Sequence, residues 1–154
     1  MHIVIIQREV YAMTDKTKDL MDKLMSTDTP EDLGNYIEDI RDKYPKSLNS
    51  YFKAVLAEKG MSIADMQKES GIDRTYIYQI MDGSKNPTKD KIVAIAIACR
   101  MTLPECQRAL EIADTGILYA KSRRDALIIY AINNGLNIRD LNGLFEEYDL
   151  PQLN

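Results

Sequence analysis

The chain has 154 residues, the length of one domain or of one domain with an appendage. Hydrophobic residues make up 45% and charged residues 29%, as in ordinary soluble globular proteins, and no apolar run approaches the roughly 20 residues that a membrane span needs. The net charge of −4 argues mildly against a general affinity for nucleic acid, which usually needs a basic surface.

The first twelve residues resemble a short strand without a partner, and a lone strand is not stable. Positions 7–10, Gln-Arg-Glu-Val, can be encoded by a sequence that contains a bacterial ribosome-binding site shortly before the codon for Met13. We therefore expect residues 1–12 to be an upstream, non-native leader and Met13 to be the natural start. A codon other than AGG or AGA at Arg8 would contradict this. The only histidine, His2, lies in the same segment, so no histidine chemistry is expected.

Two amphipathic helices are predicted within residues 13–46. The first has its apolar stripe at Leu20, Met21, Leu24 and Met25. The second begins with Thr29 as a cap and Pro30 in the first turn, and Pro45 ends it. Its apolar positions are Leu33, Tyr36, Ile37 and Ile40. We expect these helices either to pad the core or to form a dimer surface.

The stretch from Ser62 to Thr88 predicts two short helices joined by a tight turn, the arrangement of a helix-turn-helix unit. Ser62 and Asp73 can cap the two helices, and Gly71 can adopt the left-handed conformation that ends the first. The inward side consists of Ile72, Ile77 and Ile80. The outward side consists of Arg74, Thr75, Tyr76, Tyr78 and Gln79. Such donors and planar groups can reach base edges and phosphates.

The flanking segments complete a five-helix set. Residues 48–59 carry an apolar stripe and end at Gly60, Thr88 caps a helix that runs to about Arg100, and Thr102 with Glu105 forms a capping box for a helix that runs toward Ala113. The segment from Ser47 to Arg100 contains eight basic and six acidic residues, so this part has a positive net charge although the whole chain is acidic. A module of this charge can bind phosphate with a strong salt dependence.

The pattern of these positions resembles the Cro and lambda-repressor type of helix-turn-helix (XRE-like) transcriptional regulators. The residues that carry the resemblance are Gly71, Ile72, Ile77, Ile80, Gly83, Lys85, Pro87 and Thr88. The resemblance covers about Leu48 to Met101. It implies an all-α fold: a five-helix lambda-repressor-like DNA-binding domain at residues 47–113, N-terminal helices at 13–46 and a C-terminal helical extension at 114–154.

The resemblance also implies a function, that of a cytoplasmic, bacterial, sequence-specific regulator that binds double-stranded DNA as a homodimer. The helix Arg74–Met81 would enter the major groove. The base-reading residues would be Arg74, Thr75, Tyr78 and Gln79. The contacts to the DNA backbone would come from Ser62, Tyr76, Lys85, Asn86 and Lys89.

Two positions depart from the family pattern. Ile63 stands where the family often has a glutamine that touches the DNA backbone, and Gln67 stands where alanine is usual, which predicts a looser crossing of the two helices. These departures and the acidic composition leave an alternative open, a protein–protein interaction module built on a degenerate helix-turn-helix that no longer binds DNA. Its protein partner would contact the N- or C-terminal helices.

Individual side chains also have plainer interpretations. Tyr76 and Tyr78 can cover the edge of the core, and Arg74 can pair with Asp73 or Glu69. Lys85 and Lys89 can be ordinary surface lysines.

The C-terminal segment predicts two further helices. Residues 122–134 are apolar almost all round between Ala126 and Ile132, so this helix is expected to be buried, and Gly135 stops it. Asn137 with Asp140 opens the last helix, which reaches about Tyr148.

The sequence carries no pattern of a catalytic site. We find no nucleophile with a base, no glycine-rich phosphate loop and no HxxxH or CxxC motif, so neither an enzyme nor a cofactor is expected. Cys99 and Cys106 lack the spacing of metal ligands. We interpret them as reduced, buried core residues, with a disulfide as the less favoured alternative.

Overall fold

The computed structural model describes residues 18–43 and 47–154, together with the side chains of those residues except 42 and 43. The predicted leader at residues 1–12 and the predicted start at Met13 lie outside the described residues. The chain divides into two compact units, residues 1–46 and residues 47–154.

The first unit contains two helical segments, residues 18–25 and α2 (Pro30–Lys43), as the apolar patterns predicted. The cap is also confirmed, since the backbone N–H of Asp32 donates to the Thr29 hydroxyl at 3.1 Å. An ion pair between Lys23 and Asp39, at 3.4 Å, joins the two segments. Their large apolar side chains nevertheless remain in contact with solvent. The exposed ones are Met21, Leu24, Met25, Leu33 and Ile37.

The second unit consists of seven helices within residues 47–154. They are α3 (Leu48–Lys59), α4 (Ile63–Ser70), α5 (Arg74–Asp82), α6 (Lys89–Ala98), α7 (Leu103–Ala113), α8 (Arg123–Asn133) and α9 (Ile138–Glu147). Neither described range contains a strand, which confirms the predicted all-α fold. The five helices α3 to α7 occupy the positions predicted for the helix-turn-helix domain.

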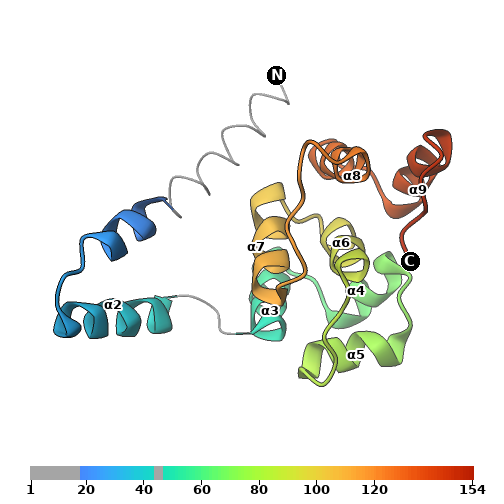
Figure 1. Cartoon of the computed structure of the whole chain (residues 1–154). Coiled ribbons are helices and arrows are strands. Elements are labelled where there is room, and N and C mark those ends of the chain that lie inside the picture. The colour runs from blue at the N-terminus through green and yellow to red at the C-terminus, as the bar shows by residue number, and fades with distance from the viewer. Residues whose placement is uncertain (1–17, 44–46) are drawn as a thin grey trace. The chain divides into compact units, whose positions relative to one another are not determined.

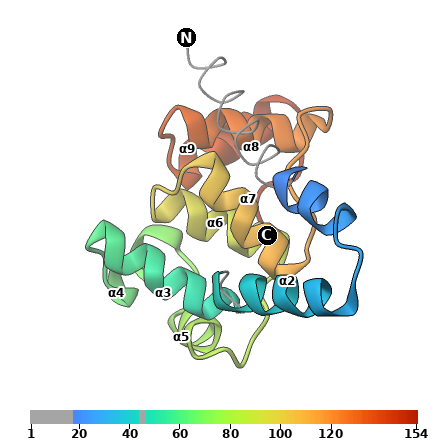
Figure 2. The same cartoon turned by 90° about the vertical axis from the view of Figure 1, so that its left-hand side faces the viewer.

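Helix α6 is the centre of this unit. Every residue from Ile92 to Cys99 is buried, and α6 contacts α4, α7, α8 and α9 (Figures 1 and 2). Burial of a large apolar side chain contributes about 1.5–3 kcal/mol. The core that surrounds α6 includes fully buried side chains from six other helices, namely Phe52, Met66, Ile77, Ile80, Leu110, Ile128 and Phe145.

The helix starts follow from local capping. Ser62 and Asp65 form a reciprocal capping box at α4, and Thr102 with Glu105 forms the predicted one at α7. The predicted caps at Asp73 and Thr88 are likewise present. Each such cap stabilises a helix by about 1 kcal/mol because it satisfies orphan backbone N–H groups.

The predicted burial of the α8 region is correct for only one side of that helix. Ile128 and Ala131 are buried, whereas Tyr130 is 53% exposed and Leu127 and Ile129 are half-buried. The reason is its place at the edge of the unit, where α6, α7 and α9 cover a single face of α8. Apolar residues all round a helix were therefore not sufficient to predict complete burial.

The two cysteines are buried free thiols, as predicted. Burial raises the pKa of the Cys99 thiol to about 11 and that of the Cys106 thiol to about 12. Both groups therefore stay protonated near neutral pH, and a thiol in that state is a poor nucleophile and a poor metal ligand.

Candidate nucleic-acid interface

The turn between α4 and α5 is closed by hydrogen bonds that need only nearby residues. Gly71 has a φ of 70°, the left-handed conformation, and its N–H donates to the Gln67 carbonyl at 3.1 Å. Ile72, which follows, is buried as predicted. Its N–H donates to the Ser70 hydroxyl at 3.3 Å, and its carbonyl accepts from the Gln67 amide at 2.9 Å. Gln67, which departs from the family pattern, therefore binds across the turn.

Helix α5 is anchored on one side and open on the other. Ile77, Ile80 and Met81 are buried almost completely, so the helix cannot rotate without exposing them. Replacing one such isoleucine by alanine typically costs about 2–5 kcal/mol, which shows how firmly this side is fixed.

The opposite side of α5 carries the predicted base-reading residues. Arg74, Thr75 and Tyr78 are exposed, and Gln79 is half-buried. Residues four positions apart lie one above the other on a helix, so Arg74 with Tyr78 and Thr75 with Gln79 form two adjacent rows. The Arg74 guanidinium lies 5.6 Å from the centre of the Tyr78 ring.

The contacts and exposure of Arg74, Tyr76 and Tyr78 distinguish between the plainer interpretations of this face. Within residues 18–43 and 47–154 Arg74 forms no ion pair, so the predicted alternatives, Asp73 and Glu69, are not its partners here. Tyr78 is 43% exposed, whereas Tyr76 is half-buried. Covering the edge of the core therefore describes Tyr76 better than Tyr78.

The loop after α5 is held in one shape. Gly83 has a φ of 86°, a conformation in which other residues are strained, and a Cβ atom there would lie 3.3 Å from the Asn49 amide nitrogen, so both features favour glycine. The Ser84 hydroxyl and the Lys85 backbone N–H both donate to the Gln79 carbonyl.

This loop presents two of the predicted backbone contacts. The side chains of Lys85 and Asn86 are exposed in it, directly after the open face of α5. Ser62 is also exposed, at the start of α4, where its hydroxyl accepts the Asp65 N–H at 3.0 Å.

Two carboxylates near these segments are held in the charged state by hydrogen bonds. The side-chain and backbone hydrogen bonds from Ser84 lower the pKa of Asp82. In the same way the backbone N–H and the hydroxyl of Ser62 lower the pKa of Asp65. Both acids therefore act as acceptors that shape the backbone beside the candidate interface.

Lys89, which was predicted to contact the DNA backbone, is paired within the protein. Its ammonium group lies 3.2 Å from the Asp125 carboxylate and 3.2 Å from the carbonyl of Ile117, both in the C-terminal extension. The side chain of Asp125 is 8% exposed and that of Lys89 is 28% exposed. The ammonium group is thus bound by two groups of the extension, so Lys89 is not proposed as a phosphate contact.

A second ion pair binds the same end of α6 to the extension. Arg124 makes a bidentate contact to Asp90, at 2.9 and 3.0 Å, and its guanidinium lies 4.8 Å from the centre of the Phe145 ring. The backbone N–H of Asn154 also donates to Asp90, at 2.9 Å. The extension is therefore tied to the start of α6 by two adjacent charge pairs.

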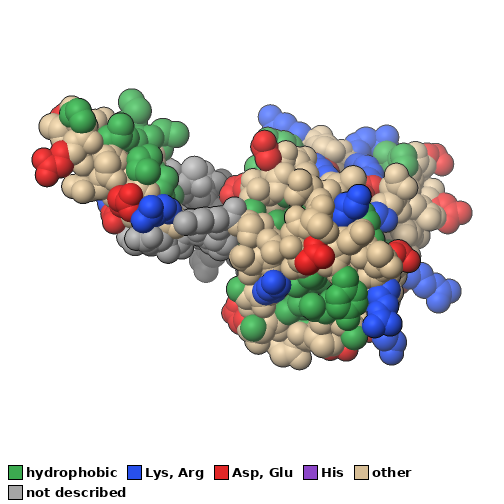
Figure 3. All heavy atoms as spheres, turned by 90° about the horizontal axis from the view of Figure 1, so that it is seen from below, with side chains coloured by type: hydrophobic (Ala, Val, Ile, Leu, Met, Phe, Trp, Pro, Cys, Tyr) green, Lys and Arg blue, Asp and Glu red, His purple; other side chains and the backbone are tan. Residues whose placement is uncertain are grey.

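The extension leaves the open face of α5 uncovered. In both views α8 and α9 lie at one end of the second unit, α6 lies in the middle and α5 lies at the other end (Figures 1 and 2). Viewed from the α5 end, lysine and arginine side chains, with acidic side chains among them, lie around an apolar cluster (Figure 3). The polar side of α5 is thus accessible to a large partner.

Comparison with known families agrees with this geometry, since the model of the Helix-turn-helix family matches residues 52–106. Residues 52–106 form a helix-turn-helix domain of the Cro and lambda-repressor type. The predicted resemblance is confirmed for this part of the chain, and domains of this family are typical of DNA-binding regulators. The comparisons with curated proteins and with solved structures each found no match.

Other kinds of site find no support in the described part of the chain. Residues 18–43 and 47–154 hold no group of three or more histidine, cysteine, aspartate or glutamate side chains that could bind a metal ion. Of the helices in the same two ranges, none has the length and apolar character that crossing a bilayer requires.

Sequence reasoning missed three features around the helix-turn-helix domain. These are the hydrogen bond from Gln67 to Ile72, the pairing of Lys89 with Asp125, and a cavity that Arg100 lines. Only the first had a local signal, because the amide of a glutamine five positions before a turn carbonyl can reach forward to it. The other two join segments that are distant in sequence.

Proposed function

We propose that the protein is a sequence-specific, double-stranded-DNA-binding transcriptional regulator in which α5 enters the major groove. One observation carries this proposal: the polar side of α5 is exposed and clear of the extension, while the isoleucines behind it lie in the core. A major groove about 12 Å wide admits a helix in this presentation.

Within this proposal the side chains divide into two roles. Arg74 and Gln79 read bases, since arginine suits the acceptor edge of guanine and glutamine suits the edge of adenine. Thr75 and Tyr78 add contacts beside them, and the Tyr78 ring supports the Arg74 guanidinium.

The second role is contact to the DNA backbone. Ser62, Lys85 and Asn86 bind phosphate, with Tyr76 at the margin of the contact. Phosphate contacts position the protein on the duplex but carry no sequence information themselves.

The test begins with selection of duplexes from a random pool by the purified full chain, followed by fluorescence anisotropy with the selected duplex and with random DNA. Arg74→Ala and Gln79→Ala should each cost about 1–3 kcal/mol on the selected duplex and little on random DNA. Lys85→Ala should weaken both equally and reduce the slope of log K against log salt by about 1.

Glu147→Ala, an exposed change on α9, serves as the control and should leave both affinities unaltered. Equal losses on both DNAs for all three test variants would refute the role assignment. Failure to enrich any sequence at low salt would refute the proposed function itself.

We further propose that the regulator is a homodimer held together by its N-terminal unit. Residues 18–25 and α2 expose five large apolar side chains, with Met25 76% exposed, and two short helices cannot bury such faces by themselves. A second copy would cover them and would also pair two reading helices for half-sites about 34 Å apart. Light scattering should give twice the chain mass, and Met25→Ser with Ile37→Ser should give the monomer; a monomeric parent would contradict this.

An interaction module remains the second candidate, and specific observations favour it. Tyr119, Tyr130 and Tyr148 are exposed on the extension, and exposed tyrosines are common in protein interfaces. If the selection experiment fails, this function becomes the better account. In either role, the reduced thiols of Cys99 and Cys106 fit a cytoplasmic protein.

A further inference from the structure

The second unit contains a cavity that has no role in the proposed DNA contact, between α4 and the turn that joins α8 to α9. We infer that this cavity binds a small amphoteric molecule, one that carries a carboxylate and an ammonium group on a compact apolar body. Binding itself does not depend on the proposed function; only its effect on DNA affinity does.

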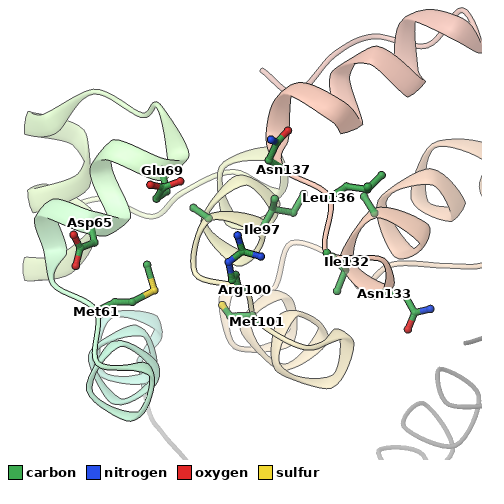
Figure 4. A pocket seen from close by; sticks show the side chains of 13 residues that line it. Met61, Asp65, Glu69, Ile97, Arg100, Met101, Ile132, Asn133, Leu136 and Asn137 are labelled. Carbon is green, nitrogen blue, oxygen red and sulfur yellow. The ribbon is translucent and has the colours of Figure 1, made fainter.

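The cavity has the size of a ligand site. Its volume is about 480 Å³, within the range of roughly 300–1,000 Å³ that small-molecule sites occupy. One wall comes from the helix-turn-helix domain, with Met61 and α4, and the facing wall comes from Ile132, Leu136 and Asn137 of the extension (Figure 4). The site therefore exists only where the extension packs against the domain.

Arg100 lies between these walls, at the end of α6 (Figure 4). Its φ is 52°, in the left-handed region where a helix usually ends with glycine. The backbone bonds of such an ending are present, since Arg100 N–H donates to Ile97 and Met101 N–H donates to Ala96. An arginine at this position costs conformational free energy that glycine would not, so a role for its side chain explains why it is there.

The Arg100 guanidinium is available to a ligand. The side chain is exposed, and over the described residues it makes neither a hydrogen bond nor an ion pair, because the interactions of Arg100 all involve its backbone. A guanidinium offers a planar pair of donors that matches a carboxylate. Arg100 would thus bind the negative end of the molecule.

The opposite charge lies on α4. Asp65 and Glu69 are four residues apart, both line the cavity, and both are exposed. Asp65 uses its Oδ2 to accept the Ser62 N–H, which leaves Oδ1 for a ligand. Glu69 has no partner in the part of the chain that the structure describes. These carboxylates would bind an ammonium group.

The combination of charges decides the class of ligand. The two carboxylates would repel a simple anion, and the guanidinium would repel a simple cation. An amphoteric molecule can place each of its charges against a group of opposite charge. Apolar side chains of Ile97 and Leu136 also line the cavity and fit an aliphatic body. Free amino acids and short peptides have this chemistry.

Such a ligand would act on the helix-turn-helix domain through Ser62. The Ser62 hydroxyl and the Asp65 carboxylate hold each other in the capping box of α4. A ligand bound to Asp65 and to the α8–α9 turn would fix α4 against the extension. Given the proposed phosphate contact of Ser62, occupancy of the cavity would change the affinity for DNA.

Calorimetry with three matched probes on the full chain tests the binding step. The probes are L-leucyl-L-leucine, its N-acetyl derivative, which keeps only the negative charge, and its amide, which keeps only the positive charge. We expect the unmodified dipeptide to bind at least tenfold more tightly than either derivative. Equal binding of all three, or no binding of any at millimolar concentration, would overturn the inference.

The variant Arg100→Gly separates ligand binding from folding. It removes the guanidinium and also relieves the left-handed backbone, so it should raise the melting temperature while it weakens dipeptide binding at least tenfold. Glu69→Gln should weaken the dipeptide and the amide but not the acetylated probe. Arg139→Ala, an exposed arginine outside the cavity, should change nothing. Undiminished binding by Arg100→Gly would refute the site.

The coupling is measured separately, as DNA affinity with and without saturating dipeptide. A shift of at least threefold is expected. Dipeptide binding without such a shift would overturn the coupling and leave the site intact. If the parent chain binds no DNA at all, the proposed function is refuted, and the calorimetric result is unaffected.

Discussion

Replacing Asp125 with alanine tests how the C-terminal extension is attached to the helix-turn-helix domain. The Oδ2 atom of Asp125 accepts the Lys89 ammonium at 3.2 Å and the Tyr119 backbone N–H at 3.0 Å, and the residue is almost completely buried. The variant removes this acceptor, so the Lys89 ammonium and the Tyr119 N–H each lose a hydrogen-bond partner.

The expected magnitude lies between two limits. Removing one member of a fully buried pair costs about 3–5 kcal/mol, and an exposed pair contributes roughly 0–1 kcal/mol. Lys89 is 28% exposed and can regain part of its hydration, so we expect a loss of about 2–3 kcal/mol in the free energy of unfolding. For a chain of this size that corresponds to a melting temperature lower by roughly 5–10 °C.

Urea denaturation and differential scanning calorimetry measure this loss. Glu146→Ala, an exposed change at the end of α9, is the matched control and should stay within about 0.5 kcal/mol of the parent. In a double-mutant cycle, Lys89→Ala combined with Asp125→Ala should cost less than the sum of the single changes, because the pair is shared. A loss below about 0.5 kcal/mol for Asp125→Ala would refute the argument that this pair anchors the extension.

Three further predictions concern the turn, the loop and the core. Gly83→Ala should destabilise the fold by about 1–2 kcal/mol, because a left-handed alanine would also press on the Asn49 amide; unchanged chemical denaturation would contradict this. Gln67→Ala should lower the free energy of unfolding by about 1 kcal/mol because the Ile72 carbonyl loses its donor. Gln67→Glu should be destabilising too, because a carboxylate has no N–H to donate to this carbonyl. An alanine variant more stable than the parent would show that the hydrogen bond is not needed. Burial raises the pKa of the Cys106 thiol from its ordinary value of 9.0 to about 12, so the unfolded chain loses this proton from about pH 9 while the folded chain retains it. The free energy of unfolding should therefore be unaffected by this group below pH 9 and fall as the pH rises from 9 toward 12, and Cys106→Ala should show a smaller fall; identical slopes would contradict the burial argument.

Most of the helix-turn-helix domain could be predicted because its signals are local. A capping residue such as Asp73 binds a backbone group three positions away, and Gly71 ends α4 through its own conformation. The inward isoleucines of α5 follow from a spacing of three residues. Local patterns of this kind predict where a helix starts, where it ends and which side it buries.

The remainder depends on contacts between distant segments. Lys89 was predicted to bind phosphate from its position in the family pattern, but Asp125, 36 positions later, takes its ammonium group. In the same way, the apolar residues around Tyr130 predicted a buried helix, although α8 lies at the edge of the unit with only one face covered. No periodicity within α8 could indicate which neighbours would be missing.

The central claim is that the polar side of α5 contacts a duplex, and mapping of amide shifts by NMR on the full chain tests it most directly. Titration with the selected duplex should perturb the backbone amides of residues 74–79 most strongly, together with those of Ser62, Lys85 and Asn86. The amides of α8 and α9 should shift little. Perturbations that gather on α8 and α9 and leave α5 unchanged would contradict the account.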